Sequence, residues 1–302
     1  MAKRRTIITL AIVSVLFIFL VAMLTIPFPS QISVGDKIAL IPIEGTISVS
    51  AGIIPGEGIV SPNEIIPLLE KAEQDASIKA VVLEINSGGG SPVASDEIAA
   101  KIKTMEKPVV AWLGDVGASG AYWIASSADK IVSHPLSITC SISAFSILPD
   151  LTGLMNKTGI NITVVRSGEY KAVGSGFEEI SDNDKAVFQG IIDSVHETFV
   201  QEIAENRDLS YAAVSNIADG RPCLGKDALN YGLVDSLGNK QDAIDLAAEL
   251  GGAEQPEVTV LKRKTSVLQE LLSTNFQNAM YAIGSGMGNQ LKGDSSGAVL
   301  VK

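Results

Sequence analysis

Three apolar runs separated by helical patterns constrain the fold of this chain most strongly. The runs are KIALIPIEGTI (37–47), KAVVLEI (79–85) and PVVAWL (108–113). Their continuous, β-branched apolar character is typical of strands that are buried on both faces. Helical patterns over 61–75 and from about 93 to 105 lie between them. This alternation of strands and helices predicts an α/β fold with a mostly parallel sheet.

The second half of the chain continues with patterns of the same kind. We expect a strand near 161–165, a long helix over about 182–206, helices near 226–231 and 240–250, a strand at 257–261 and a helix at 266–272. The last residues, 284–302, are rich in glycine and lack periodicity, which favours a mobile tail. We therefore expect one domain over 37–255 and a C-terminal extension over 256–302.

The N-terminus combines the basic sequence MAKRR with an uncharged apolar stretch over 6–27. About 20 apolar residues span a bilayer, whereas a cleavable signal peptide has an apolar core of about 7–15 residues before a small-residue cleavage site. AMLTIPFPS offers no clear site of that kind, which favours an uncleaved anchor over a signal peptide. Because positive residues remain inside, the rest of the chain is expected outside the cytoplasm. The expected segments are a cytoplasmic basic segment (1–6), a transmembrane signal anchor (7–27) and a linker (28–36).

Charge and cysteine content narrow the possible partners. The chain has 34 acidic residues against 23 Lys and Arg, a net charge of −11, which argues against nucleic acid as a main partner. Cys140 and Cys223 are too few for a disulfide scaffold and match no zinc-binding pattern. We expect two independent, mostly buried thiols, and the sequence leaves their pairing open.

Two glycine-bearing turns follow neighbouring apolar runs. NSGGGS (86–91) comes after the second run, and GDVGAS (114–119) comes after the third. Ligands bind beyond the carboxyl ends of strands in open parallel sheets. Backbone N–H groups in such turns can form an oxyanion hole, with Ser119 as a nucleophile. Tight structural turns or a phosphate cradle are the alternatives, but neither a P-loop nor a dinucleotide-binding glycine motif is present.

A nucleophilic Ser119 needs a base, and the chain has only two histidines. His134 stands beside a proline in a turn, and His196 lies in the long helical pattern, so a Ser-His pair is disfavoured. Lys171, in RSGEYKAVGSGFEEIS (166–181), is the alternative, because a desolvated lysine loses its proton and can then accept one from a serine. From composition alone, a solvated surface position is the favoured interpretation of Lys171.

The segments around these residues resemble signal peptide peptidase A, a family of Ser-Lys serine peptidases with the Clp/crotonase fold of repeated ββα units. GASGAYWIASSADKIVSHPLSITCSI is similar to the family's nucleophile segment, which runs A-S-G-G-Y-Y-I-A, A-D-K-I and T-G-S-I-G. INSGGGS resembles its N-S-P-G-G loop, and GEYKAVGSGFEEIS resembles its G-x-Y-K-x-x-x-S-P-F segment. The motifs occur in the family's order, and the resemblance covers about residues 37–250.

The resemblance implies a role for each matching residue. Ser119 corresponds to the nucleophile and Lys171 to the general base. Ser141 corresponds to a serine that positions the lysine amine. Gly90 corresponds to the oxyanion glycine of the loop, with the N–H of Gly120 as the second donor.

The chain departs from the family motifs at four positions. Gly88 and Gly176 stand where the family has prolines, which makes both loops less rigid without removing a catalytic group. Cys140 and Ser143 stand where the family has glycines around Ser141, a change that alters the wall of the pocket.

The resemblance further implies peptide hydrolysis through an acyl-enzyme, without a cofactor. The expected substrates are cleaved signal peptides and other hydrophobic peptides with small apolar residues at the cleavage position, and the anchor would hold the enzyme in the cell membrane. Family members with one core repeat form rings whose serine and lysine can come from neighbouring protomers, so we expect a homo-oligomer such as an octamer. Two alternatives remain open here: a Ser-Lys peptidase of the same fold that is specific for a membrane-protein partner of stomatin type, and an inactive scaffold.

Overall fold

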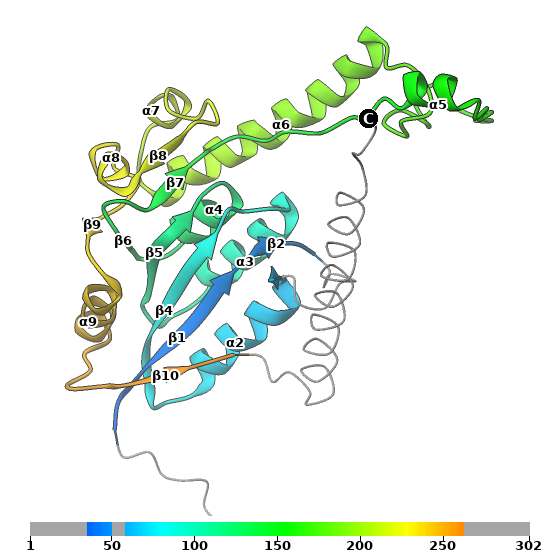
Figure 1. Cartoon of the computed structure of the whole chain (residues 1–302). Coiled ribbons are helices and arrows are strands. Elements are labelled where there is room, and N and C mark those ends of the chain that lie inside the picture. The colour runs from blue at the N-terminus through cyan, green and yellow to red at the C-terminus, as the bar shows by residue number, and fades with distance from the viewer. Residues whose placement is uncertain (1–34, 50–57, 263–302) are drawn as a thin grey trace, which may run out of the picture. The chain divides into compact units, whose positions relative to one another are not determined.

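A parallel β-sheet lies at the centre of the described part of the protein (Figure 1). The structure is a computed structural model that describes residues 35–49 and 58–262. The strands are β1 (Lys37–Glu44), β2 (Thr46–Ile47), β3 (Ile59–Val60), β4 (Ile78–Ser87), β5 (Val109–Gly117), β6 (Lys130–Ser133), β7 (Ile138–Cys140), β8 (Pro222–Leu224), β9 (Ser236–Leu237) and β10 (Glu257–Val260). The helices are α2 (Pro62–Gln74), α3 (Pro92–Lys103), α4 (Gly120–Ser126), α5 (Thr152–Thr158), α6 (Asp182–Asn206), α7 (Tyr211–Ser215), α8 (Gly225–Asn230) and α9 (Lys240–Gly251).

The order of the strands confirms the α/β class with a mostly parallel sheet. Neighbouring strands run β10-β1-β4-β5-β6-β9, and each of these pairs is parallel. β7 pairs with β5 in parallel and with β8 in antiparallel orientation. Residues 257–260, which we expected in a C-terminal extension, form the edge strand β10 beside β1.

Helices cover both faces of the sheet, which explains why its strands are apolar throughout. Along β4, Val81, Leu83 and Ile85 face the helices α2, α3 and α4, whereas Ala80 and Val82 face α9. All five side chains are fully buried. A strand covered on both faces needs apolar residues at every position rather than at every second one.

The long helix α6 has the predicted bounds, and its two ends lie in different surroundings. At its start, Ser181 and Asp184 form a capping box. Near its end, Phe199, Val200 and Ile203 are buried in the core. The preceding residues of α6 are mostly exposed, and Figure 1 shows this part of the helix projecting beyond the sheet, next to the α5 segment.

The strand predicted near 161–165 is wrong. Residues 160–166 form no regular element, and Val165 is 92% exposed. A strand needs a hydrogen-bonded neighbour, and this segment has none among the residues that the structure describes. The short helices α5 and α7 were not anticipated.

The expectation of two independent thiols is also wrong, because Cys140 and Cys223 form a disulfide. The two residues are 83 positions apart in the sequence, but the antiparallel pairing of β7 with β8 places Thr139 opposite Cys223. Their Cα atoms consequently lie 5.5 Å apart, within the range that a disulfide spans.

The predicted anchor at 7–27, most of the linker, the helix at 266–272 and the tail at 284–302 lie outside the described residues. Within the two ranges that are described, the structure contains no helix long and apolar enough to cross a membrane.

Candidate active site

Ser119 lies at the turn between β5 and α4, where its backbone is strained. It is the N-cap of α4 with φ 55° and ψ −128°, a conformation that costs a residue with a side chain about 1–3 kcal/mol. Its N–H donates to the carbonyl of Cys140 at 2.9 Å, and its own carbonyl accepts from Trp123 N–H at 3.0 Å. The turn therefore holds Ser119 half-buried, at the carboxyl end of a central strand.

The glycine loop after β4 lies against this turn. Gly89 and Gly90 have φ values of +96° and +157°. A Cβ atom on Gly89 would lie 2.6 Å from Gly120 N, and one on Gly90 would lie 2.0 Å from the carbonyl oxygen of Ile47. Only glycine permits such close approach of backbone segments. The structure thus brings together Gly90, Ser119 and Gly120, three of the candidate site residues.

Two backbone donors at this junction are free to bind a ligand. Neither Gly90 N–H nor Gly120 N–H donates to an acceptor among the described residues. A Cβ on Gly120 would lie 3.3 Å from Gly90 N, which shows how close the two backbones come. A pair of backbone N–H groups beside a serine is the arrangement that stabilises an oxyanion during acyl transfer.

Ser87 supports the glycine loop and was not singled out from the sequence. Its hydroxyl donates to the carbonyl of Gly45 at 2.5 Å and accepts from Gly89 N–H at 3.1 Å. Its carbonyl accepts from Ala118 N–H at 3.2 Å, next to Ser119. Ser87 therefore links the end of β1, the glycine loop and the serine turn. Its position after a buried strand, just before three glycines, was the available indication.

Ser141 lies in the loop next to Ser119, since the preceding residue Cys140 accepts the Ser119 N–H bond. The backbone of Ser141 is left-handed, with φ 53°. Its hydroxyl donates to the carbonyl of Gly220 at 3.2 Å, and its N–H donates to the carbonyl of Arg221 at 3.1 Å. Within one chain, Ser141 thus contacts these carbonyls.

Lys171 is not brought to Ser119 within one chain. It is exposed, in a turn-rich loop, and its backbone N–H donates to the carbonyl of Gly168. The flanking residues Glu169 and Ala172 line a pocket together with Asp184, in the first turn of α6. Along the same helix, at 1.5 Å per residue, Asp184 lies about 16 Å from Val195 and about 22 Å from Phe199, the two residues of α6 that line the Ser119 pocket.

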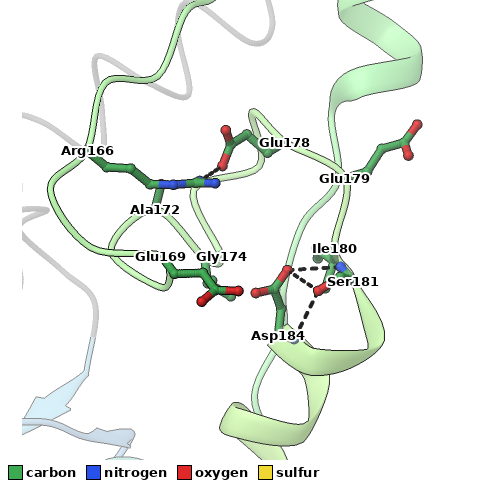
Figure 2. A pocket seen from close by; sticks show the side chains of 10 residues that line it. Arg166, Glu169, Ala172, Gly174, Glu178, Glu179, Ile180, Ser181 and Asp184 are labelled. Carbon is green, nitrogen blue, oxygen red and sulfur yellow. Dashed lines mark hydrogen bonds and ion pairs between the residues drawn. The ribbon is translucent and has the colours of Figure 1, made fainter.

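The pocket beside Lys171 is polar and mostly acidic (Figure 2). It has a volume of about 320 Å³, and its lining is Arg166, Glu169, Ala172, Val173, Gly174, Glu178, Glu179, Ile180, Ser181 and Asp184. Arg166 forms an ion pair with Glu178 across the loop. Hydrogen bonds from the Ser181 hydroxyl and N–H hold the pKa of Asp184 below its usual value. These contacts join Arg166, which precedes the Lys171 loop, to Glu178, which follows it, and cap the start of α6.

A smaller pocket of about 90 Å³ opens at Ser119. Its lining is Gly90, Pro92, Ser119, Gly120, Trp123, Ser143, Ala144, Phe145, Val195 and Phe199. The rings of Trp123 and Phe199 stack at 4.8 Å between centroids and form its apolar wall. Ser143, which stands where the family motif has glycine, lines this pocket, whereas Cys140, expected to alter the same wall, lines a different one. The pocket has room for one small apolar side chain.

Neither histidine is placed as a base for Ser119. His134 is exposed, and its Nδ1 accepts from Leu136 N–H at 3.2 Å. His196 is half-buried on α6 and does not line the Ser119 pocket. In the described part of the chain, no group of three or more His, Cys, Asp or Glu side chains could hold a metal ion.

Comparison with known proteins identifies the family behind this geometry. The model of peptidase family S49 matches residues 101–254, about half of the chain, including Ser119, Ser141 and Lys171. The chain belongs to peptidase family S49. The resemblance to serine peptidases of the signal peptide peptidase A type is thereby confirmed.

Three relatives illustrate the similarity. A Methanocaldococcus jannaschii protein named as a candidate protease is 36% identical over 230 residues, which are 76% of this chain and 73% of that protein. An Enterococcus faecium protein named as a candidate signal peptide peptidase is 35% identical, over 59% of this chain and 52% of its own length. A chloroplastic serine protease of Arabidopsis thaliana is 30% identical over 85% of this chain, but the match spans only 38% of that protein.

Proposed function

We propose that the chain is a membrane-anchored serine endopeptidase that cleaves hydrophobic peptides, with Ser119 as nucleophile and Lys171 as general base. The observation that carries this proposal is the strained Ser119 turn beside the two free N–H groups of Gly90 and Gly120. Family membership supports the same reaction class. The anchor at 7–27, the dyad and the substrate class are parts of the proposal.

The mechanism follows from the groups at this junction. Neutral Lys171 takes the proton of the Ser119 hydroxyl, and the oxygen attacks the peptide carbonyl carbon. The N–H groups of Gly90 and Gly120 stabilise the oxyanion, a contribution worth a factor of about 10²–10³ per donor in related sites. The lysine then gives its proton to the leaving amine, and later activates the water that releases the acyl group from Ser119.

Lys171 is supplied, in this proposal, by a neighbouring protomer of a homo-oligomer such as an octamer. Support comes from its loop at the start of α6, where Asp184 lies about 16–22 Å along the helix from the residues of α6 that line the Ser119 pocket. The part of the sequence between Ser119 and Lys171 exposes large apolar side chains, among them Phe145 at 82% and Val165 at 92% exposure. Exposed apolar side chains gathered on one segment are typical of a surface that another protein covers. When Lys171 of a neighbour arrives, the Ser141 hydroxyl accepts a hydrogen bond from its amine.

The substrates we propose are remnant signal peptides and other apolar peptides outside the cytoplasm. The pocket of about 90 Å³ beside Ser119, with its Trp123–Phe199 wall, supports a small apolar side chain at the cleavage position. The Cys140–Cys223 disulfide supports an extracytoplasmic site, since disulfides persist mainly in oxidising compartments.

The test is peptidase activity of the full chain in detergent on an apolar fluorogenic peptide, with wild type beside Ser119→Ala and Lys171→Ala. Both variants should lose turnover while keeping the secondary structure and assembly size of the wild type. Lys185→Ala, which removes an exposed lysine from the start of α6, is the matched control and should keep wild-type activity. Near-full activity of Lys171→Ala would exclude it as the base.

A further inference from the structure

The Cys140–Cys223 disulfide lies directly behind the proposed nucleophile. The carbonyl of Cys140 accepts the Ser119 N–H bond at 2.9 Å, and Ser141 follows Cys140 in the chain. We propose that this disulfide positions Ser119 and Ser141 for acyl transfer, so that cleaving it slows turnover in a folded enzyme. The inference rests on the proposed function, because it concerns the same nucleophile.

The backbone at Cys140 needs to be held in place. Cys140 and Ser141 have consecutive positive φ values of 62° and 53°. This left-handed region favours glycine, and a residue with a side chain tends to leave it unless its surroundings prevent that. If Cys140 relaxed, its carbonyl would turn away from Ser119 N–H, and Ser119 has a strained φ of its own.

The sheet alone gives Cys140 little support from β5. The parallel pairing of β7 with β5 is limited to Val116 opposite Ile138, and Thr139 adds one hydrogen bond from its hydroxyl to the carbonyl of Gly117 at 2.7 Å. Both contacts come before Cys140. At Cys140 itself, apart from the Ser119 N–H bond to its carbonyl, the link to the rest of the described residues is the pairing with β8, which the disulfide makes covalent.

The same bond fixes the groups that hold Ser141. The Ser141 hydroxyl and N–H donate to the carbonyls of Gly220 and Arg221, just before Cys223 in the chain. Since Cys140 precedes Ser141 and Cys223 follows Arg221, one covalent bond sets the position of both sides of these hydrogen bonds. The disulfide therefore joins the end of β7, which leads into Ser141 and contacts Ser119, to β8.

A small reductant can reach this bond. Cys223 is half-buried, and both cysteines line a pocket of about 340 Å³ together with Arg221 and Tyr231. A water-soluble phosphine attacks one sulfur, the S–S bond breaks and the other sulfur leaves as a thiolate. Water then releases the second thiol and leaves the phosphine oxide.

The experiment separates positioning from general stabilisation with two variants of the full chain. Cys223→Ser removes the disulfide and leaves Cys140 untied at its positive φ. The double variant Cys140→Gly, Cys223→Ser lacks the disulfide too, but glycine adopts the positive φ without strain. Both variants lack the same cross-link, so both lose the stabilisation that it provides by restricting the unfolded chain. Non-reducing mass spectrometry first confirms the disulfide in the wild type, and its absence there would overturn the proposal.

The positioning role predicts that Cys223→Ser lowers kcat by about 10- to 100-fold with little change in KM, as expected for a nucleophile displaced by about 1 Å. The double variant should recover most of that loss. Phosphine should lower kcat of the folded wild type, reversibly on reoxidation, and leave the double variant unaffected. This comparison remains valid even if Cys223→Ser fails to fold.

Equal kcat in the two variants, or an unchanged kcat in the reduced and folded wild type, would overturn the proposal. Failure of the proposed function is distinguishable, since Ser119→Ala would then keep wild-type turnover.

Discussion

The distance between Ser119 and Lys171 allows a decisive mixing experiment. We predict that Ser119→Ala and Lys171→Ala, each inactive as a pure protein, recover activity when both occur in one assembly. The reason is that the Ser119→Ala chain still carries the lysine, and the Lys171→Ala chain still carries the serine. A site that draws the two residues from neighbouring protomers can therefore be complete in a mixed ring.

The expected magnitude follows from the geometry of a ring with one type of head-to-tail interface. Within one chain, α6 places Asp184, beside the Lys171 loop, about 16–22 Å along the helix from the residues that line the Ser119 pocket, and in the proposed ring a chain does not complete its own site. In a ring mixed at random in equal amounts, half of the chains carry the serine, and half of their neighbours carry the lysine. About a quarter of the sites are then complete, and mixed rings should show about a quarter of the wild-type kcat.

The assay uses two affinity tags, co-expression of the two full-length variants and purification over both tags in turn. Turnover of an apolar fluorogenic peptide is compared with wild-type rings that carry the same two tags. The matched control replaces the Lys171→Ala partner by the double variant Ser119→Ala, Lys171→Ala, which restores no serine and should remain inactive. Mixed rings as inactive as this control, or a wild type that is active as a monomer, would refute the shared site.

Three further substitutions test separate parts of the structure. Gly90→Ala places a Cβ 2.0 Å from the Ile47 carbonyl oxygen, so kcat should fall by roughly 100-fold or more while circular dichroism stays unchanged; near-normal turnover would exclude Gly90 from the oxyanion site. Tyr122→Phe removes the buried hydroxyl that donates to the Leu233 carbonyl at 2.6 Å, and urea unfolding should show a loss of about 1–3 kcal/mol. Asp184→Asn removes a carboxylate whose pKa is lowered in the folded chain by its capping-box serine. A carboxylate whose pKa is lowered on folding stabilises the folded state above its unfolded pKa, and this stabilisation is lost as the pH falls through its folded pKa. The thermal destabilisation of Asp184→Asn at pH 7 should therefore vanish in acid. An equal destabilisation at both pH values would contradict this.

The local patterns of the sequence predicted the sheet and the Ser119 junction well. β1, β4 and β5 are continuous apolar runs because both of their faces are covered. Gly89, Gly90 and Gly120 lie where two backbone segments approach closely, so that a side chain would not fit. Such positions can be recognised in a sequence because glycines cluster directly after a strand. The apolar strands and the glycine turns are predictable because each is determined by residues close together in the sequence, within one strand-turn-helix unit.

The features that depend on contacts between distant segments could not be predicted in the same way. Cys140 and Cys223 meet only because β7 and β8, short strands from separate parts of the chain, pair with each other. The apolar residues near 161–165 have the composition of a strand but lie exposed, with no strand beside them in the described part of the chain. The position of Lys171 depends on the length and direction of α6, and the residues around the lysine do not indicate either.

In the proposed ring, helix α6 would give the assembly a route to cooperativity. Its Phe199 end lines the Ser119 pocket of its own chain, while its first turn carries the loop that presents Lys171. A straight helix moves as a lever: a tilt of about 5° at Phe199 displaces a point about 22 Å away by about 2 Å. In a ring with shared sites, a peptide that shifts Phe199 in one protomer would therefore move the lysine of the next site. Occupancy of one site would then be transmitted around the ring by a rigid element, and the dependence of rate on peptide concentration would be sigmoidal.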